Sequence, residues 1–227
     1  MDLSFTQVLV DLASLGRINV LDLSIDPADY LHIDLSRSIA ERISYDLSKP
    51  DECEAYITSE LIRLGRNVAC GGYLEERLIY RSQLFVEEGE KVRSIHLGMD
   101  FWCKAGTPVY VPVEGVLHGF KDNNDPGNYG PTIILAHSTQ DITWYSLYGH
   151  LSRGSLKNLE IGQYMPAGSI LGKIGTKEEN GEYAPHLHFQ LIQDLQGMIA
   201  DYPGVCALKD LEFYQMNCPD PNLLLQI

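Results

Sequence analysis

The sequence predicts a mainly β protein, α+β overall, in which an antiparallel β domain follows a helical N-terminal region. From about residue 73, short β-rich runs alternate with Gly, Pro and Asn turns, a pattern typical of antiparallel domains with many hairpins. Before that point, apolar residues recur at helical spacing. We therefore expect residues 1–72 to form a helical N-terminal region and residues 73–227 a β-rich domain that ends in a C-terminal coil.

The clearest helix signal is "SKPDECEAYITSELIRLGR", residues 48–66. Pro50 suits a first helical turn, and Gly65 is a natural C-terminal stop. One stripe at helical spacing carries the apolar residues Cys53, Ile57, Leu61 and Leu64. Residues 26–47 are also expected to be helical.

Five runs carry the β-strand signal of short apolar segments between turn residues. These runs are residues 77–86, 107–120, 131–137, 142–151 and 186–192. The tail, residues 201–227, is expected to be ordered coil that closes over the β core.

Composition and charge narrow the class of protein. The chain has 227 residues, of which 44% are hydrophobic, enough for a substantial core. A formal net charge of −14 argues against electrostatic binding to nucleic acid or to anionic membranes. No apolar run approaches the ~18 residues that a membrane span needs. The N-terminal segment lacks a basic region followed by a clean apolar one, so we expect no signal peptide and a cytoplasmic location.

The five cysteines are odd in number and scattered, and none forms a C-x-x-C pair. This spacing argues against a structural zinc knuckle. Free thiols of an intracellular protein are the expectation. One disulfide, for instance between Cys206 and Cys218, is the alternative.

The run "APHLHFQ", residues 184–190, places two histidines one residue apart in an apolar setting. In a strand, His186 and His188 share one face, while Leu187 and Phe189 point to the other. Two imidazoles held side by side on a rigid strand predict a metal site or an acid/base pair.

A second motif, "SIHLGMDFW", supplies what the histidine pair lacks. His96 and Asp100 are spaced i, i+4 and share a face, and Gly98 allows close backbone approach. A catalytic zinc site takes three protein ligands from His and carboxylate and keeps one open position. His96, Asp100 and one histidine of the pair can provide them, and the other histidine stays spare. His150, in "LYGHLS", is a further candidate for acid/base or oxyanion chemistry.

Taken together, these motifs resemble the lysostaphin-type zinc metallopeptidases, which are bacterial cell-wall endopeptidases. The stretch "SIHLGMDF…AGTPVYVPVEGVL" is similar to the H-x-G-x-D…G-T-P-V…G-V segment of that family. "YGPTIILAH", "YSLYGHLS", "IGQYMPAGSILGKIG" and "PHLHFQ" follow in the family's order. The resemblance covers roughly residues 90–193.

The resemblance implies a compact antiparallel β fold of the duplicated hybrid motif type and a Zn²⁺ cofactor. It implies that His96, Asp100 and His188 are the zinc ligands. His186 and His150 match the two catalytic histidines; we choose His186 as the base and His150 for oxyanion stabilisation, although the two roles could exchange. The implied reaction is hydrolysis of a peptide or amide bond, in a peptide or peptidoglycan-like substrate, by attack of zinc-bound water.

The sequence also departs from the family pattern. Gln190 stands where family members usually have Glu, and the approach loop, residues 175–188, is more acidic than usual. Within the family, the chain resembles the non-secreted domain that lies between kinase-like and aminotransferase-like domains of large bacterial proteins. Two alternatives stay open: a non-hydrolytic zinc-binding recognition module, and a cytoplasmic hydrolase of small amino-acid conjugates. The N-terminal region could inhibit the groove or simply pack against the domain.

Other candidate residues are discounted. His32, His118 and His137 lie outside the motif spacing and are expected to be structural or exposed. The arginines that precede the metal motif are expected to form surface ion pairs, with attraction of a substrate carboxylate as the alternative. They are Arg77, Arg81 and Arg93.

Overall fold

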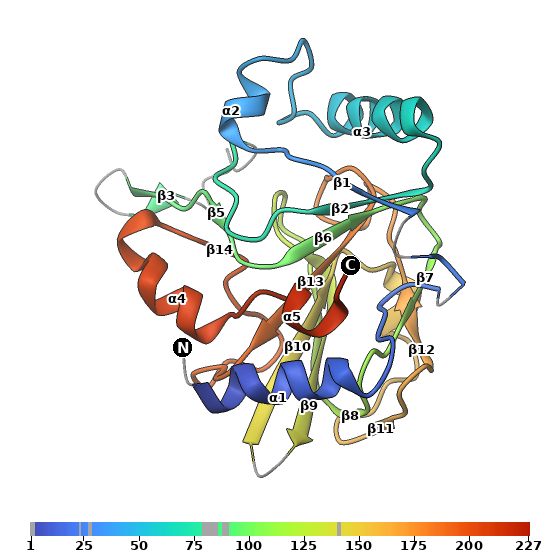
Figure 1. Cartoon of the computed structure of the whole chain (residues 1–227), viewed down its shortest axis with the longest axis vertical. Coiled ribbons are helices and arrows are strands. Elements are labelled where there is room, and N and C mark those ends of the chain that lie inside the picture. Colours follow the sequence, from blue (N-terminus) through green and yellow to red (C-terminus); the bar gives the residue numbers. More distant parts are fainter. Residues whose placement is uncertain (1–2, 23, 27–28, 79–85, 88–90, 140–141) are drawn as a thin grey trace.

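The computed structural model describes residues 3–22, 24–26, 29–78, 86–87, 91–139 and 142–227. Its main feature is an eight-stranded sheet in the order β1-β2-β6-β13-β10-β9-β8-β11 (Figure 1). The strands are β1 (Tyr30–His32), β2 (Val68–Gly71), β6 (Met99–Trp102), β8 (Gly115–Asn123), β9 (Gly130–Thr139), β10 (Ile142–Gly149), β11 (Tyr164–Met165) and β13 (His186–Ile192). All neighbours are antiparallel except β1 and β2, which are parallel. The predicted mainly β, antiparallel fold is confirmed.

Among the described residues, three short antiparallel pairs accompany the main sheet. They are β7 (Pro108–Tyr110) with β12 (Ile170–Lys173), β5 (Ile95–His96) with β14 (Val205–Cys206), and β3 (Val86–Glu87) with β4 (Lys91–Val92). Four of the five predicted β runs contain strands as expected. Of the fifth, residues 79–85 lie outside the described residues.

The helices surround the sheet: α1 and α5 pack on one face, α4 packs on the apolar cluster of the opposite face, and α2 and α3 lie beyond β1 (Figure 1). They are α1 (Leu3–Ser14), α2 (Arg37–Ala40), α3 (Pro50–Leu64), α4 (Leu211–Asn217) and α5 (Asn222–Leu225), with 3-10 turns at Arg153–Leu156 and Leu208–Asp210. The helix predicted over residues 48–66 is confirmed as α3. Pro50 occupies its first turn, and Gly65 ends it in the left-handed conformation with φ 64°.

Two secondary-structure predictions are wrong. In the described part of residues 26–47, the only α-helix is the short α2, and Tyr30–His32 is a strand. Pairing of β1 with β2 decided that segment, because a tertiary partner overrides local helix preference. The tail is not only coil, since it contains α4 and α5. Because β2 also pairs with β6, the N-terminal region extends the sheet that carries the candidate site. The predicted division into residues 1–72 and residues 73–227 stays a prediction.

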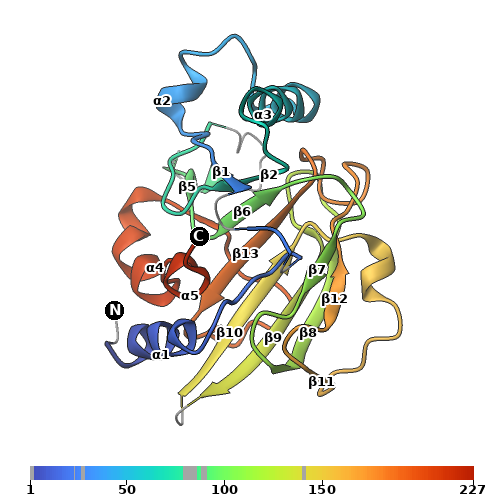
Figure 2. The ribbon, with the colours of Figure 1, turned by 45° about the vertical axis from the view of Figure 1, so that its right-hand side comes forward.

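The core lies on both faces of the sheet. On one face, α1 and α5 cover the strands (Figure 2). The ring centroids of Phe5 on α1 and Trp144 on β10 are 5.9 Å apart. This face includes Leu187 and Phe189 of β13. The opposite face is covered by the C-terminal tail, with Tyr202 among its buried side chains. Among the described residues, no helix is long and apolar enough to cross a membrane.

A third apolar cluster joins the N-terminal region to the edge of the candidate site. Ile57 of α3 and Leu35 pack in it with Trp102 of β6 and Ala184. Figure 2 shows α2 and α3 beyond β1, at the end of the molecule away from α1. The N-terminal residues therefore contribute to two separate parts of the core.

Candidate metal centre

Strand pairing brings the two sequence motifs together. His188 on β13 lies directly opposite Asp100 on β6, and His186 lies opposite Trp102. Because side chains alternate along a strand, both histidines project to the face opposite Leu187 and Phe189, as the sequence predicts. The histidine pair and Asp100 are thus on one face of the sheet.

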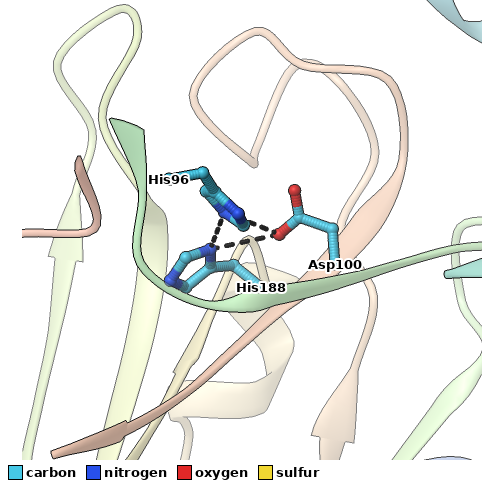
Figure 3. A group of neighbouring side chains, drawn as sticks. All are labelled: His96, Asp100 and His188. Carbon is cyan, nitrogen blue, oxygen red and sulfur yellow. Dashed lines mark hydrogen bonds and ion pairs between the residues drawn. The ribbon is translucent and has the colours of Figure 1, made fainter. Parts of the chain in front are cut away.

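Three side-chain atoms converge at this point (Figure 3). Nε2 of His96 lies 2.8 Å from Nδ1 of His188 and 3.2 Å from Oδ1 of Asp100. Nδ1 of His188 lies 3.1 Å from the same oxygen. All three side chains are buried. One potential ligand atom from each lies within 4.8 Å of the other two, close enough for the three residues to hold one metal ion.

The outer hydrogen bonds determine which ring nitrogens carry protons. Nδ1 of His96 donates to the carbonyl oxygen of Gly72 at 2.9 Å. Nε2 of His188 donates to Oε1 of Gln190 at 2.9 Å. The Gln190 amide is oriented by its own donor group, which bonds the carbonyl oxygen of Pro203 and Sγ of Cys218. The facing nitrogens, Nε2 of His96 and Nδ1 of His188, are therefore the unprotonated ones in the neutral rings.

This protonation pattern is the test of whether the residues fit a metal. When both rings are neutral, two nitrogen lone pairs and a carboxylate oxygen point at one another in a buried space, and none of the three can donate a hydrogen bond to the others. A cation satisfies all three, and imidazole nitrogen with carboxylate oxygen is a donor set that Zn²⁺ accepts. The three residues fit Zn²⁺. Gln190, which stands where members of the resembled family usually have Glu, orients the ligand His188.

Gly98 explains how His188 comes so close to the β5–β6 segment. A Cβ atom at residue 98 would lie 2.6 Å from Cε1 of His188 and 2.7 Å from the carbonyl oxygen of Phe189. Only a glycine leaves space for the ring. The expectation that Gly98 allows close backbone approach is confirmed.

The two remaining histidines lie beside the cluster. The ring centroids of His150 and His186 are 4.1 Å apart, and Nε2 of His186 is 3.9 Å from Oδ1 of Asp100. Nδ1 of His150 donates to the carbonyl oxygen of Asn180 and Nδ1 of His186 to that of Ala184, each at 2.7 Å. Both neutral rings therefore keep an unprotonated Nε2.

Aromatic neighbours limit the movement of this histidine pair. The Trp102 ring stacks on His186 at 5.9 Å, and Tyr183 packs edge-on against both histidines. His150 itself has a positive φ of 62°, an uncommon conformation for a residue with a side chain. The fold thus holds the imidazole of His150 at the end of β10 by a local bend of the backbone.

Burial sets the charge of these groups. It lowers the pKa of His186, and it lowers the pKa of His150 well below its ordinary value, with the neighbouring histidines adding to the effect. Burial also lowers the pKa of His96, to about 4. Burial alone would raise the pKa of Asp100, but His96 and the permanent charge of Arg77 more than offset it and hold that pKa well below its ordinary value. Near neutral pH these three histidines are neutral and Asp100 is a carboxylate.

The cluster opens into a groove of about 860 Å³. His150, His186 and the three candidate ligands all line it. One wall comes from the N-terminal region and includes Leu47 and Pro50. The other walls come from residues 126–129, 181–184 and 198–205.

One prediction about the charged residues is wrong. Arg77, expected in a surface ion pair, is buried and bonds Asp100. The sequence could not predict this ion pair, because Arg77 and Asp100 are 23 residues apart and no local pattern links them. Arg93 is half-buried and lines the groove, so its expected surface ion pair stays a prediction. Arg81 lies outside the described residues.

The other discounted residues behave as structural or surface groups. His137 is buried, with its ring stacked on Trp144 and Nε2 2.7 Å from Oγ of Ser146. His32 is exposed and His118 packs against Tyr145. All five cysteines are free thiols, so the disulfide alternative for Cys206 and Cys218 is not realised in this structure.

Residues 94–199 match peptidase family M23. This segment is an M23 peptidase domain. The match contains all five candidate site residues and stops short of Arg77. The M23 segment is similar to peptidoglycan DD-endopeptidase ShyA of Vibrio cholerae serotype O1, with 32% identity over 124 residues that cover 53% of this chain and 26% of that protein.

Two other comparisons involve lysostaphin. Lysostaphin of Staphylococcus staphylolyticus is 34% identical over 96 residues, which cover 42% of this chain and 18% of that protein. The solved catalytic domain of lysostaphin from Staphylococcus simulans is 29% identical and aligns with a TM-score of 0.38 over 54% of this chain and 80% of that one. The chain thus spans about a quarter or less of the length of the two curated relatives.

Proposed function

We propose that this chain is a zinc-dependent peptidase that hydrolyses a peptide or amide bond, with a peptidoglycan-like peptide as substrate. The observation that supports it most is the convergence of His96, Asp100 and His188 beside two neutral histidines in an open groove. Membership of the M23 segment in a peptidase family supports the reaction, and the similarity to ShyA, a peptidoglycan DD-endopeptidase, supports the substrate class.

The proposal gives Zn²⁺ to His96, Asp100 and His188. Zn²⁺ in such a site polarises a carbonyl group and lowers the pKa of water towards ~7. The chain then has to supply a base for the water's proton, an acid for the leaving amine, and an environment that favours negative charge on the carbonyl oxygen.

His186 is the better placed base. Its unprotonated Nε2 lies 3.9 Å from Oδ1 of Asp100, the oxygen that faces the two ligand histidines. The low pKa of His186 keeps Nε2 free to accept a proton at neutral pH. Once protonated, the same nitrogen can deliver that proton to the leaving amine.

The oxyanion role of His150 carries a condition. Because Nδ1 of His150 donates to Asn180, the neutral ring presents a lone pair at Nε2 and has no proton there for an oxyanion. His150 can stabilise negative charge only after it takes up a proton, for which His186 at 4.1 Å between ring centroids is the nearest source. We propose that the two histidines handle one proton as a pair.

The test is a mass-spectrometric cleavage screen of the zinc-loaded chain. Purified peptidoglycan, pooled short peptides and small amides of amino acids are the substrates, and His186→Ala, His150→Ala and the exposed His32→Ala are the variants. We expect cleavage by the parent and by His32→Ala, a loss of about 10²- to 10⁴-fold in the two site variants, and unchanged zinc content.

Three other results of the screen would each contradict part of the proposal. Full activity in His186→Ala would remove its assigned role. Cleavage confined to small amides would favour a hydrolase of amino-acid conjugates. Zinc binding without any cleavage would favour a recognition module.

A further inference from the structure

We propose that Arg77, itself held by Glu75, is a positioning residue that keeps Asp100 as a single-oxygen ligand of the metal. The inference rests on the metal site of the proposed function. It concerns what determines the coordination number of the bound ion and the preference of the site for one metal over another. Neither Arg77 nor Glu75 belongs to the segment that matches the M23 family.

The two oxygens of Asp100 have different partners. Oδ2 accepts a hydrogen bond from Nη1 of Arg77 at 2.6 Å, and the two side chains are 1% and 2% exposed. Oδ1 faces His96 and His188 at 3.2 Å and 3.1 Å. A carboxylate bound in this way offers only one oxygen to a cation between the histidines.

Arg77 is itself held from the other side. Its Nε donates to Oε2 of Glu75, and Oε1 of Glu75 accepts a hydrogen bond from the backbone nitrogen of Leu35 at 2.8 Å. The guanidinium carbon lies 5.4 Å from the centroid of the Trp102 ring. A planar guanidinium bound to two carboxylates and packed on an aromatic ring has one orientation, which a lysine could not reproduce.

The backbone around Arg77 is shaped for this arrangement. Gly72 has φ +101°, and a Cβ atom at that position would lie 1.9 Å from Nη2 of Arg77. The backbone nitrogen of His96 donates to the carbonyl oxygen of Glu75, and that of Arg77 donates to Ser94. The same short segment therefore orients the imidazole of His96, through the Gly72 carbonyl oxygen, and the carboxylate of Asp100.

The consequence concerns coordination. With Oδ2 bound to Arg77, the three protein ligands supply three donor atoms and favour four-coordinate Zn²⁺ with one open position. If Arg77 is removed, Oδ2 becomes available and Asp100 can bind through both oxygens. A higher coordination number with more oxygen donors suits ions such as Mn²⁺ better than Zn²⁺.

The experiment uses the full chain loaded with Co²⁺, whose visible absorption is strong in four-coordinate sites and weak at higher coordination. The variants are Arg77→Met, Arg77→Lys and Glu75→Gln, with Arg37→Met as the matched control because Arg37 pairs with Glu41 at the surface. The second readout is the ratio of Zn²⁺ to Mn²⁺ affinity, measured by competition with a chelator. Circular dichroism verifies the fold of each variant.

We expect strong Co²⁺ bands in the parent and in Arg37→Met. Arg77→Met should bind one ion with much weaker bands, and its preference for Zn²⁺ over Mn²⁺ should fall on the order of tenfold, the range for outer-shell changes at metal sites. Arg77→Lys and Glu75→Gln should lie between the two. A purely structural ion pair would alter stability and leave the spectrum and the metal preference unchanged.

Unchanged Co²⁺ bands and metal preference in folded Arg77→Met would overturn the proposal. If that variant does not fold, Glu75→Gln decides in the same way, because it keeps the arginine and removes its anchor. A parent chain that binds Zn²⁺ and Co²⁺ but cleaves no substrate would contradict the proposed reaction and leave this inference standing. A parent chain that binds neither metal would contradict both.

Discussion

His188 and Asp100 lie directly opposite each other across the β13–β6 pair, with Nδ1 and Oδ1 3.1 Å apart. They are 88 residues apart in the chain, so their alignment depends on the register of two strands. A slip of one residue would turn His188 to the opposite face of the sheet. The relative positions of these two candidate ligands therefore depend on the register of the β13–β6 pair.

Gly98→Ala should disturb His188 more than any other part of the site. The new Cβ atom would lie 2.6 Å from Cε1 of His188, and the Phe189 carbonyl oxygen blocks its retreat. We expect the free energy of unfolding to fall by about 1–3 kcal/mol and the zinc affinity to fall on the order of tenfold. Thermal unfolding and chelator competition measure the two effects.

Gly154→Ala is the control for this substitution, because its Cβ atom would have Oγ of Ser152, at 3.8 Å, as its nearest neighbour. It should leave zinc affinity unchanged. Equal zinc affinity in Gly98→Ala and Gly154→Ala would show that the contact with His188 is relieved at no cost to the site.

Gln190→Leu should weaken zinc binding by about 10- to 100-fold. Leucine has no acceptor for Nε2–H of His188, so the tautomer that presents Nδ1 to the metal loses its support. Gln190→Glu keeps an acceptor and should retain most of the affinity. The exposed Gln215→Leu on α4 is the control, and isothermal titration with Zn²⁺ is the measurement. If Gln190→Leu binds Zn²⁺ like the parent, the amide has no role in orienting His188.

His137 should make the protein less stable in mild acid. Burial lowers the pKa of His137 to about 4 in the folded chain, below the ordinary value of 6.5 that it regains on unfolding. Between these values the unfolded chain binds more protons, so the stabilising contribution is complete above pH 6.5 and is lost as the pH falls towards 4. From pH 7 to pH 5 the loss is about 2 kcal/mol, at 1.36 kcal/mol per pH unit.

Urea unfolding of the parent and of His137→Gln at pH 7 and pH 5 measures this contribution. The variant lacks the titrating ring but keeps the rest of the chain, including the metal site. We expect its free energy of unfolding to fall by about 2 kcal/mol less than that of the parent over this interval. Parallel pH dependences in the two proteins would exclude a role for His137.

Truncation at about residue 70 should give insoluble protein. Phe5 and Leu9 of α1 are fully buried in the main core, and β1 and β2 extend the sheet from β6. Glu75 would also lose its bond to the backbone of Leu35. Solubility and zinc content of the truncated chain are the measurements. A soluble truncated chain with higher activity would instead establish that the N-terminal region is inhibitory.

Local signals predicted the parts of the fold that depend on local chemistry. Period-2 patterns and turn residues located β8, β9, β10 and β13, and Pro50 and Gly65 bounded α3. The helix predicted over residues 26–47 was wrong because the strand found there, β1, forms only by pairing with β2. No local pattern in the sequence reveals that partner. The helices of the tail were missed for a related reason, since α4 and α5 are short and pack on the sheet.

The sequence by itself determined the chemical groups of the site: a pair of histidines on one strand face, and a histidine and an aspartate four residues apart. Residue type and strand periodicity suffice for that, because both are local properties. Only the tertiary structure decided which nitrogens face the metal, since the acceptors that orient them, Gly72 and Gln190, depend on backbone packing. It also decided that Arg77 is a buried partner of Asp100 instead of a surface charge, because burial is a property of the whole fold.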